Sequence, residues 1–355
     1  MKRIGIVGCG NISGIYFENI MNKFSNITVS ACCDLDESRA KAAAEKYHVP
    51  EILTTDELLH SDKVDIVLNL TTPPYHYQIC MDALNAGKHV YTEKPLSLNK
   101  DEGAALVKTA QQKGLYIGCA PDTFMGGGIQ TCRKLIDDGW IGEPVAATAF
   151  MTCHGHESWH PDPAFYYKVG GGPMFDMGPY YITALVNLMG PVASVSGEAR
   201  ITFPQRTITS QPKYGTQIDV EVATHVAGTM RFENGAIATV ITSFDVWAAN
   251  LPFIEIYGTA GSLSVPDPNM FGGSVKVRKS FHEAWHEIPL THPYSENSRG
   301  YGLSDMARAI EEGSACRASG QLANHVLEVM HAFIASSDSG RRITIASTVE
   351  KPAAL

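Results

Sequence analysis

Residues 2–14 read KRIGIVGCGNISG, an apolar run followed by closely spaced glycines and small residues. The run that ends at Val7 predicts a buried strand, and the spacing of the apolar residues beyond it, through Ile20, predicts a helix. Gly8 permits a tight turn, and Gly10 lets a ligand come close to the backbone at the N-terminus of that helix. A strand, a glycine turn and a helix in this order predict a site for the pyrophosphate of a dinucleotide.

Two further positions refine this expectation. The third small position of the motif holds Ser13 instead of glycine, and serine is still small enough for close packing of helix against strand. Asp34 follows the second predicted strand, residues 27–33, where an acid is expected about 20 residues after the glycines. Its carboxylate can accept bonds from the ribose hydroxyls of NAD and repels the 2′-phosphate of NADP, and Leu35 beside it offers no positive charge. We therefore predict NAD in preference to NADP. The alternative is a glycine turn followed by a solvated loop acid.

The first third of the chain alternates strand and helix patterns. Segments of helical spacing separate short apolar runs at 4–8, 27–33, 64–70, 89–91 and 115–119. Strands without polar alternation that alternate with helices predict a parallel sheet covered on both faces. We therefore predict an α/β Rossmann domain with a doubly wound parallel sheet over residues 1–120.

The pattern changes after about residue 121. Helical spacing recurs at 127–138 and 174–189, most of 192–288 has the period-2 pattern of strands, and Asn234-Gly235 is a hairpin signal. Two helical segments and a short strand follow. We predict that residues 121–355 form an α+β domain with a large, mostly antiparallel sheet.

Composition excludes several classes of protein. The 355 residues include 37 acidic and 28 basic side chains, a net charge of −9 without a basic patch, which argues against nucleic acid as a partner. The sequence contains no apolar run of the roughly 18 residues that a membrane helix needs. The eight cysteines show no C-x-x-C spacing, so we expect reduced thiols in a cytoplasmic protein.

Three later segments add a family resemblance. Residues 71–76 read TTPPYH, residues 93–95 read EKP, and residues 170–180 read GGGPMFDMGPY. Together with the glycine turn they resemble the glucose–fructose oxidoreductase, inositol dehydrogenase and MocA (Gfo/Idh/MocA) family over nearly the whole chain. The resemblance implies a Rossmann domain and a sheet-rich C-terminal domain for substrate binding and oligomerisation, with dimers or tetramers common. It also implies oxidation or reduction of a sugar, an inositol or a related polyol with NAD(P).

The resemblance assigns roles to residues. Lys94 is implied to be the active-site lysine, followed by a cis peptide bond to Pro95, and Asp176 is implied to be a carboxylate that contacts the substrate. The residues expected to bind the cofactor are Gly8, Gly10, Asn11, Ile12, Asp34, Thr71, Thr72, Pro73, His76, Glu93 and Lys94. For His76, a helix-capping or packing role is an equal alternative.

The chain departs from the family pattern at the acid/base position. Many members have G-x-H-x-x-D, whereas this sequence has Tyr180 in place of the histidine and Thr183 in place of the second acid. Some members, such as the dihydrodiol dehydrogenases, are similar in having tyrosine there. Alcohol oxidation requires a base for the hydroxyl proton, and a free phenol with a pKa of about 10 is a poor one. An ammonium about 4 Å away would contribute roughly 4 kcal/mol toward ionisation of the phenol.

We therefore predict that Lys94 polarises the reacting oxygen and lowers the pKa of Tyr180, the acid/base. Asp176, one helical turn before Tyr180, would orient a neighbouring hydroxyl. The structural alternatives remain: Lys94 as a surface lysine, Asp176 as an acid at a helix N-terminus, and Tyr180 as a core aromatic with Tyr181 competing for its role.

A histidine- and aromatic-rich segment precedes the glycine run. Residues 153–167 read CHGHESWHPDPAFYY, in which Trp159 and Tyr166 could stack on a sugar ring. His154 and His156, with His160, would bond the hydroxyls. For the aromatic residues, loop packing is the alternative. On an extended strand His154 and His156 would point to one side as a metal pair, but no further ligand stands at suitable spacing, so we predict no metal.

The leading hypothesis is an NAD-dependent sugar or polyol dehydrogenase. Two alternatives from other classes stay open: an NAD-assisted glycosidase of the same fold, and a non-catalytic NAD-binding sensor or regulator.

Overall fold

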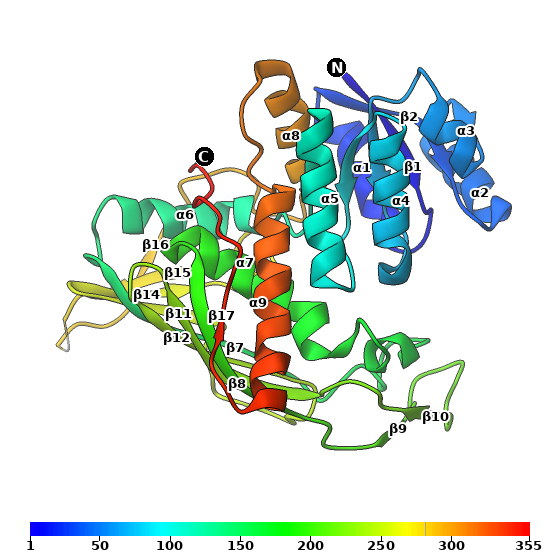
Figure 1. Cartoon of the computed structure of the whole chain (residues 1–355). Coiled ribbons are helices and arrows are strands. Elements are labelled where there is room, and N and C mark those ends of the chain that lie inside the picture. Colours follow the sequence, from blue (N-terminus) through cyan, green and yellow to red (C-terminus); the bar gives the residue numbers. More distant parts are fainter. Residues whose placement is uncertain (281) are drawn as a thin grey trace. The chain divides into compact units, whose positions relative to one another are not determined.

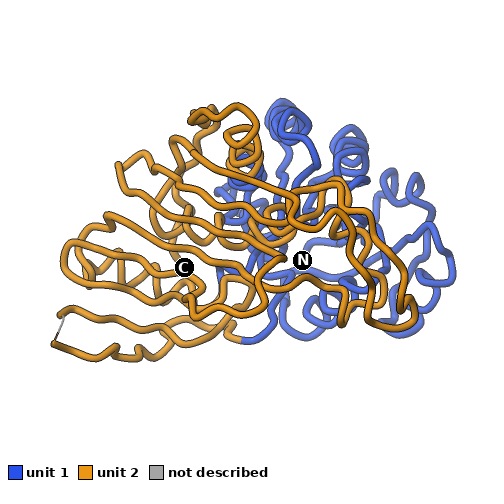
Figure 2. Tube along the Cα trace, turned by 90° about the horizontal axis from the view of Figure 1, so that it is seen from below, with its two compact units in different colours: residues 1–125, 296–327 blue, residues 126–295, 328–355 orange. Residues whose placement is uncertain are grey.

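The computed structural model describes residues 1–280 and 282–355. They form two compact units, one of residues 1–125 and 296–327 and the other of residues 126–295 and 328–355 (Figure 2). The expected division was two continuous domains that meet after residue 120. The observed division falls at residue 125, and the chain returns to the first unit before it ends.

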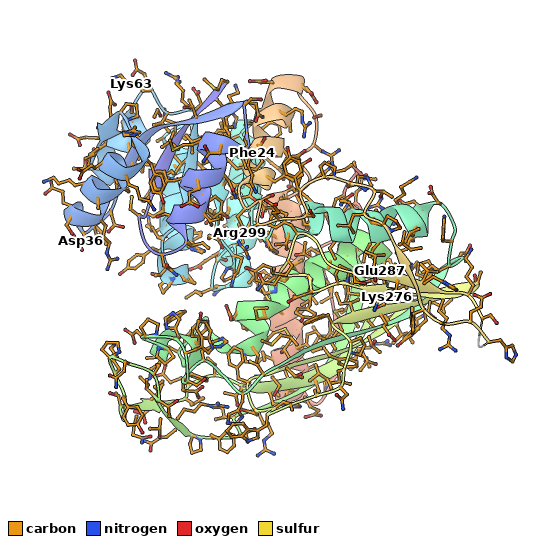
Figure 3. All side chains as sticks on the ribbon, turned by 180° about the vertical axis from the view of Figure 1, so that it is seen from behind. Phe24, Asp36, Lys63, Lys276, Glu287 and Arg299 are labelled. Carbon is orange, nitrogen blue, oxygen red and sulfur yellow. The ribbon has the colours of Figure 1, made fainter. Side chains whose placement is uncertain are left out.

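Side-chain contacts explain this return. Phe24 (Figure 3) stacks on Tyr301 with ring centroids 6.0 Å apart, and the Asn19 amide donates to the carbonyls of Asn297 (3.1 Å) and Arg299 (2.8 Å). The Asp122 carboxylate accepts two backbone N–H groups where helix α8 (Tyr301–Glu312) begins. The segment 296–327 therefore belongs to the first unit because it satisfies polar groups there.

A six-stranded parallel sheet forms the centre of the first unit, in the order β3-β2-β1-β4-β5-β6. The strands are β1 (Lys2–Val7), β2 (Ile27–Cys33), β3 (Glu51–Ile52), β4 (Ile66–Asn69), β5 (His89–Thr92) and β6 (Ile117–Cys119). The strand order reverses at β1, and open sheets of this kind bind ligands at such a switch point, outside the carboxyl ends of the strands. The predicted doubly wound α/β fold is confirmed.

Helices with readable end signals connect these strands. They are α1 (Ser13–Asn22), α2 (Glu37–Tyr47), α3 (Thr55–His60), α4 (Pro73–Asn85) and α5 (Lys100–Lys113), with the short 3-10 turn η1 (Thr123–Met125) after β6. The Asp36 carboxylate accepts the Ser38 N–H at the start of α2, and Asn99 accepts the Asp101 N–H at the start of α5. Gly114 ends α5 in the left-handed region, which glycine adopts without strain.

The second unit contains a nine-stranded sheet in the order β16-β15-β14-β13-β7-β12-β11-β8-β17. Its strands are β7 (Pro144–Thr152), β8 (Val192–Arg200), β11 (His225–Phe232), β12 (Ile237–Ser243), β13 (Ile254–Gly258), β14 (Gly261–Val265), β15 (Val275–Arg278), β16 (His286–Ile288) and β17 (Ile343–Thr344). Only β7 and β12 pair in parallel, so the expected, mostly antiparallel sheet is confirmed. Lys276 and Glu287 are direct cross-strand partners near one edge (Figure 3).

Three helices pack on this sheet (Figure 1). They are α6 (Gly127–Asp137), α7 (Gly172–Met189) and the later part of α9 (Gly320–Ser339). Gly228 pairs with Gly197 across β11 and β8, and a side chain on Gly228 would overlap Phe333 of α9. Both glycines therefore let the helix approach the sheet closely. A two-stranded ribbon, β9 (Gln205–Thr207) with β10 (Gln217–Asp219), and the 3-10 turn η2 (Ala164–Tyr167) lie outside the main sheet.

Two further observations concern the chain as a whole. All eight cysteines are free thiols, and six of them are buried. Within 1–280 and 282–355, no helix has the length and apolar character required to cross a membrane.

Candidate active site

The glycine turn leaves room above the N-terminus of α1. Gly8 has a φ of +97°, and a Cβ there would lie 2.9 Å from the carbonyl carbon of Leu70, so this position requires glycine. A Cβ on Gly10, in contrast, would meet no atom within 4 Å. The Ser13 hydroxyl is buried and donates to the Gly10 carbonyl (2.7 Å), which explains why serine serves at the third small position. The next turn residue, Asn11, is exposed beside this space, and Ile12 after it is 37% exposed.

Asp34 links the end of β2 to this turn. Its two carboxylate oxygens accept the backbone N–H groups of Cys9 (2.7 Å) and Asp36 (2.8 Å). A carboxylate offers about four lone-pair positions, so two remain for ribose hydroxyls. Leu35 is 93% exposed and brings no cation to this place. The open space over Gly10 and the donor and acceptor set around Asp34 fit a dinucleotide, and NAD better than NADP.

The loop after β4 is built on the buried Asn69. Its side-chain oxygen accepts the backbone N–H (3.1 Å) and the hydroxyl (2.7 Å) of Thr71. Thr72 then forms the N-cap of α4, and Pro73 takes the first helical position, where its missing N–H is harmless. Thr71, Thr72 and Pro73 thus stand at the same carboxyl edge of the sheet as the glycine turn.

His76 is packed between two loops of the first unit. Its ring is fully buried, with Nδ1 2.6 Å from the Pro95 carbonyl and Nε2 2.9 Å from the Thr71 carbonyl. Burial lowers the pKa of His76 below its ordinary value. Because both ring nitrogens are engaged with backbone, the packing alternative fits: His76 ties the loop after β4 to the loop after β5.

Glu93 and Lys94 follow β5 directly. The Glu93 carboxylate is buried and accepts bonds from the Tyr16 hydroxyl (2.7 Å) and the Lys94 backbone N–H (3.1 Å). The Lys94–Pro95 peptide bond is cis, as the family resemblance implied. Lys94 is half-buried at this carboxyl edge, and Glu93 holds its backbone instead of facing solvent.

The second unit holds the other expected catalytic residues on helix α7. Asp176 and Tyr180 lie one turn apart, as expected from their spacing. Tyr180 is 8% exposed, whereas Tyr181 is 2% exposed. Burial raises the pKa of Tyr181 well above its ordinary value, which disfavours a proton-transfer role for it.

His156 lies beside Asp176. Its Nε2 is 3.5 Å from the Asp176 carboxylate, and its Nδ1 has no hydrogen-bond partner among the described residues. Three aromatic rings surround the imidazole: Tyr166 at 4.0 Å, Phe244 at 4.7 Å and Trp159 at 5.2 Å between centroids. We call His156, Asp176 and these three rings the imidazole–carboxylate cluster. It brings together four of the predicted substrate residues.

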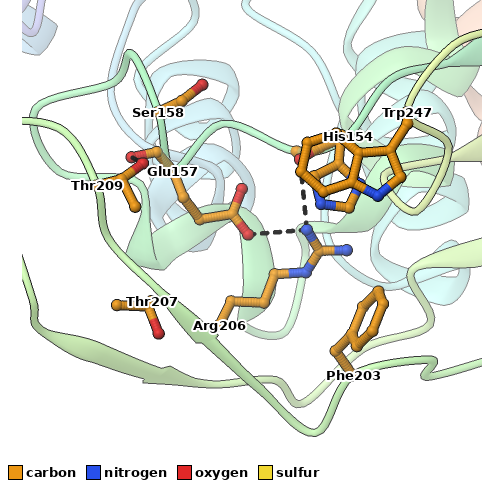
Figure 4. A pocket seen from close by; sticks show the side chains of 9 residues that line it. His154, Glu157, Ser158, Phe203, Arg206, Thr207, Thr209 and Trp247 are labelled. Atoms are coloured by element: carbon orange, nitrogen blue, oxygen red, sulfur yellow. Dashed lines mark hydrogen bonds and ion pairs between the residues drawn. The ribbon is translucent and has the colours of Figure 1, made fainter.

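His154 lies apart from this cluster. Its ring stacks on Trp247, with centroids 3.4 Å apart and planes 17° apart, beside a cavity of about 400 Å³ (Figure 4). Arg206 stands in the cavity wall and forms ion pairs with Glu157 (2.8 Å) and with Asp245. Sequence reasoning missed Glu157, Arg206, Asp245 and Trp247. Glu157 stood inside the segment that it singled out, whereas the other three had no local signal.

Metal ligands do not gather at either place. Over the described ranges, no three His, Cys, Asp or Glu side chains are close enough to hold a metal ion. His160 Nδ1 accepts the Asp162 backbone N–H (3.0 Å), and its ring lies edge-on to the rings of Trp159, Phe165 and Tyr166.

Comparison with known proteins agrees with these features. A family model described as an oxidoreductase family with an NAD-binding Rossmann fold matches residues 2–120, and one described as the GFO/IDH/MocA C-terminal domain matches residues 129–264. The D-xylose dehydrogenase of Paenarthrobacter nicotinovorans is 24% identical over 87% of this chain and 85% of its own length. The myo-inositol 2-dehydrogenase of Thermotoga maritima is 25% identical over 74% of each chain.

Solved structures share the whole fold. Levoglucosan dehydrogenase in complex with NADH and L-sorbose superposes with a TM-score of 0.83 at 19% identity, covering 98% of this chain and 99% of the other. At that identity the likeness concerns the fold alone. With family models over both parts of the chain and a dinucleotide cradle at the switch point of the parallel sheet, the conclusion is that the chain belongs to the Gfo/Idh/MocA family of oxidoreductases and that its N-terminal part is an NAD-binding Rossmann domain.

Proposed function

We propose that this protein is an NAD-dependent dehydrogenase that acts on a CH–OH group of a sugar or polyol. The observation that supports it most directly is the open space over Gly10 beside the Asp34 carboxylate, with Lys94 at the same edge of the sheet. The relatives named as xylose and inositol dehydrogenases point to the substrate class. When bound, the nicotinamide supplies the hydride acceptor or donor.

The chain's own residues handle the substrate and the proton. The Lys94 ammonium donates to the reacting oxygen and stabilises negative charge on it. Tyr180 takes the hydroxyl proton in the oxidation and returns it in the reduction. Asp176 accepts a bond from a neighbouring hydroxyl, and His156 stands 3.5 Å away to stabilise that carboxylate. The proposal requires Lys94 and Tyr180 to reach the same substrate oxygen.

A dehydrogenase screen of monosaccharides and inositols with NAD and NADP tests the proposal. We expect NADH to form with at least one neutral substrate, and NAD to be preferred over NADP. Hydrolysis of aryl glycosides, measured in parallel, tests the glycosidase alternative, in which no net NADH appears. Turnover of neither kind, together with tight NADH binding, would favour the sensor alternative.

Variants then test the residue roles. Lys94→Ala and Tyr180→Phe should each lower kcat by about 10²- to 10⁴-fold, because each removes a group that acts in the transition state. Tyr181→Phe is the matched control, and its kcat should stay close to that of the wild type. Undiminished turnover of Lys94→Ala, with unchanged NADH affinity, would refute the catalytic assignment.

A further inference from the structure

The cavity beside His154 has the size and place of a ligand site. Its volume of about 400 Å³ lies within the usual range of small-molecule pockets, about 300–1,000 Å³. Its lining residues are His154, Gly155, Glu157, Ser158, Phe203, Arg206, Thr207, Thr209 and Trp247. His154 and Glu157 flank His156 in the sequence, so one loop borders both this cavity and the imidazole–carboxylate cluster.

The charges in the wall oppose an anionic ligand. The Arg206 guanidinium is 5% exposed and is already shared by two buried carboxylates, those of Glu157 and Asp245. It also donates to the Phe244 carbonyl (2.8 Å). Glu157 in the wall and Asp245, the second partner of Arg206, together outweigh the charge of this cation, which disfavours a phosphate or a carboxylate as ligand.

The polar groups in the wall suit a ligand with hydroxyl groups. Arg206 Nε and His154 Nδ1 are buried and have no hydrogen-bond partner among the described residues. Ser158, Thr207 and Thr209 add hydroxyls that both donate and accept. Buried polar atoms are usually paired, so these two nitrogens indicate that a group from outside the chain completes the wall.

The wall also carries exposed aromatic surface. Trp247 is 82% exposed although its indole stacks on His154, and Phe203 is 42% exposed and contacts the same imidazole edge-on. Such surface can be covered by the C–H face of a sugar ring, and its burial is favourable. Aromatic surface beside hydroxyls, without a free cation, matches an uncharged sugar.

We propose that this cavity binds a second, uncharged sugar ring of the substrate, so that the protein acts on a neutral disaccharide or glycoside. The first ring would react beside the imidazole–carboxylate cluster, on the other side of the shared loop. Trp247 provides the platform for the second ring, and the Arg206–Glu157 pair is positioned to bond its hydroxyls. The inference rests on the proposed function, which it extends to the class of substrate.

Isothermal titration calorimetry on the full chain tests the inference apart from turnover. The probes are maltose, cellobiose, sucrose and trehalose, with glucose as the one-ring reference. We expect at least one disaccharide to bind more tightly than glucose. Trp247→Ala should weaken that binding at least tenfold and leave glucose affinity unchanged, whereas Trp247→Phe should retain most of the affinity.

A second tryptophan offers the matched control. Trp140 is also partly exposed, but it packs against Lys279, 5.0 Å from its ring centroid. Trp140→Ala should leave disaccharide binding unchanged.

Three results would overturn the inference: no binding of any neutral disaccharide, equal loss of glucose and disaccharide affinity in Trp247→Ala, or tighter binding of a phosphorylated or carboxylated analogue. NADH formation, measured separately, keeps the two proposals distinct. Disaccharide binding that depends on Trp247 without any turnover would refute the dehydrogenase and leave the second-ring site standing. Turnover of monosaccharides without Trp247-dependent disaccharide binding would support the dehydrogenase and refute the second-ring site.

Discussion

A methyl group at Gly10 should separate cofactor binding from folding. The ideal Cβ there meets no atom within 4 Å, so the folded chain has room for alanine. Alanine does not fit at Gly8, because φ is +97° there and the Cβ would lie 2.9 Å from both the carbonyl carbon and the carbonyl oxygen of Leu70. Both glycines belong to one turn, so the two variants distinguish a glycine that the fold requires from a glycine that ligand binding requires.

The magnitudes follow from these two environments. Where the backbone conformation is compatible, Gly→Ala changes the free energy of unfolding by only about 0.4–1 kcal/mol, and in the stabilising direction. Gly10→Ala should therefore leave the cofactor-free protein at least as stable as the wild type. Gly8→Ala should lower its free energy of unfolding by at least about 2 kcal/mol, because left-handed strain of about 1–2 kcal/mol adds to overlap with backbone that cannot rotate away.

The effect of Gly10→Ala on the cofactor should be large. The methyl group would occupy the space that the pyrophosphate needs beside the amides at the start of α1. Loss of one charge-assisted hydrogen bond, about 1.5–3 kcal/mol, corresponds to a roughly 10- to 100-fold weaker Kd for NADH. Urea unfolding of the cofactor-free variants and calorimetric titration with NADH measure the two effects separately. If Gly10→Ala bound NADH as tightly as the wild type, the assignment of this turn to the pyrophosphate would be refuted.

Three further variants test other parts of the structure. Burial raises the pKa of Asp122 to about 6, against about 3.9 in the unfolded chain. The contribution of Asp122 to the free energy of unfolding is therefore full below about pH 4 and falls by about 3 kcal/mol by about pH 6. Asp122→Asn should remove this decrease from urea unfolding measured across the range, and an unchanged pH dependence would contradict the reasoning. Asp34→Asn should strengthen binding of NADPH relative to NADH by about tenfold, because it removes the charge that repels the 2′-phosphate. Titration with both nucleotides measures the ratio of the two Kd values. An unchanged ratio would place Asp34 away from the ribose. Arg206→Met should lower the free energy of unfolding by about 3–5 kcal/mol, since it leaves Glu157 and Asp245 buried without a cation; a loss below about 1 kcal/mol in urea unfolding would count against this pairing.

The parallel sheet was predictable because its signals are local. Apolar runs such as the first three residues of β4 (Ile66–Asn69) lie fully buried, and the glycine turn with Asp34 depends on residues whose types alone restrict the backbone and the ligand. The hairpin at Asn234-Gly235 was equally local, and Gly235 indeed has a φ of +91°. The cytoplasmic location, expected from the cysteine pattern, and the homo-oligomer, implied by the family resemblance, stay predictions.

The return of residues 296–327 to the first unit was not predictable in the same way. Helix α8 has an ordinary apolar face, and nothing in its spacing tells which sheet that face will cover. The contacts that decide it, such as Phe24 with Tyr301, join residues that are nearly 280 positions apart. Long-range pairing of this kind is absent from any periodic pattern.

The backbone conformation of Gly155 determines where the side chains of His154 and His156 lie. The expectation that His154 and His156 point to one side assumed an extended strand, but β7 ends at Thr152. Between the histidines Gly155 has a φ of +80°, and a Cβ there would overlap the Glu157 carboxylate and the Tyr167 hydroxyl. Only glycine permits this turn, so the turn gives the two imidazoles different partners.

The turn at Gly155 also bears on the proposed two-ring substrate. Because of the turn at Gly155, His154 packs on Trp247 beside the cavity, whereas His156 faces the Asp176 carboxylate. The turn also brings Glu157 to Arg206, which lies 49 residues further along the chain. If one loop serves two rings of a substrate, Gly155→Ala should weaken disaccharide binding and slow turnover together, whereas Trp247→Ala should affect the disaccharide alone. Comparison of these two variants therefore tests whether the loop is the element that joins the two sites.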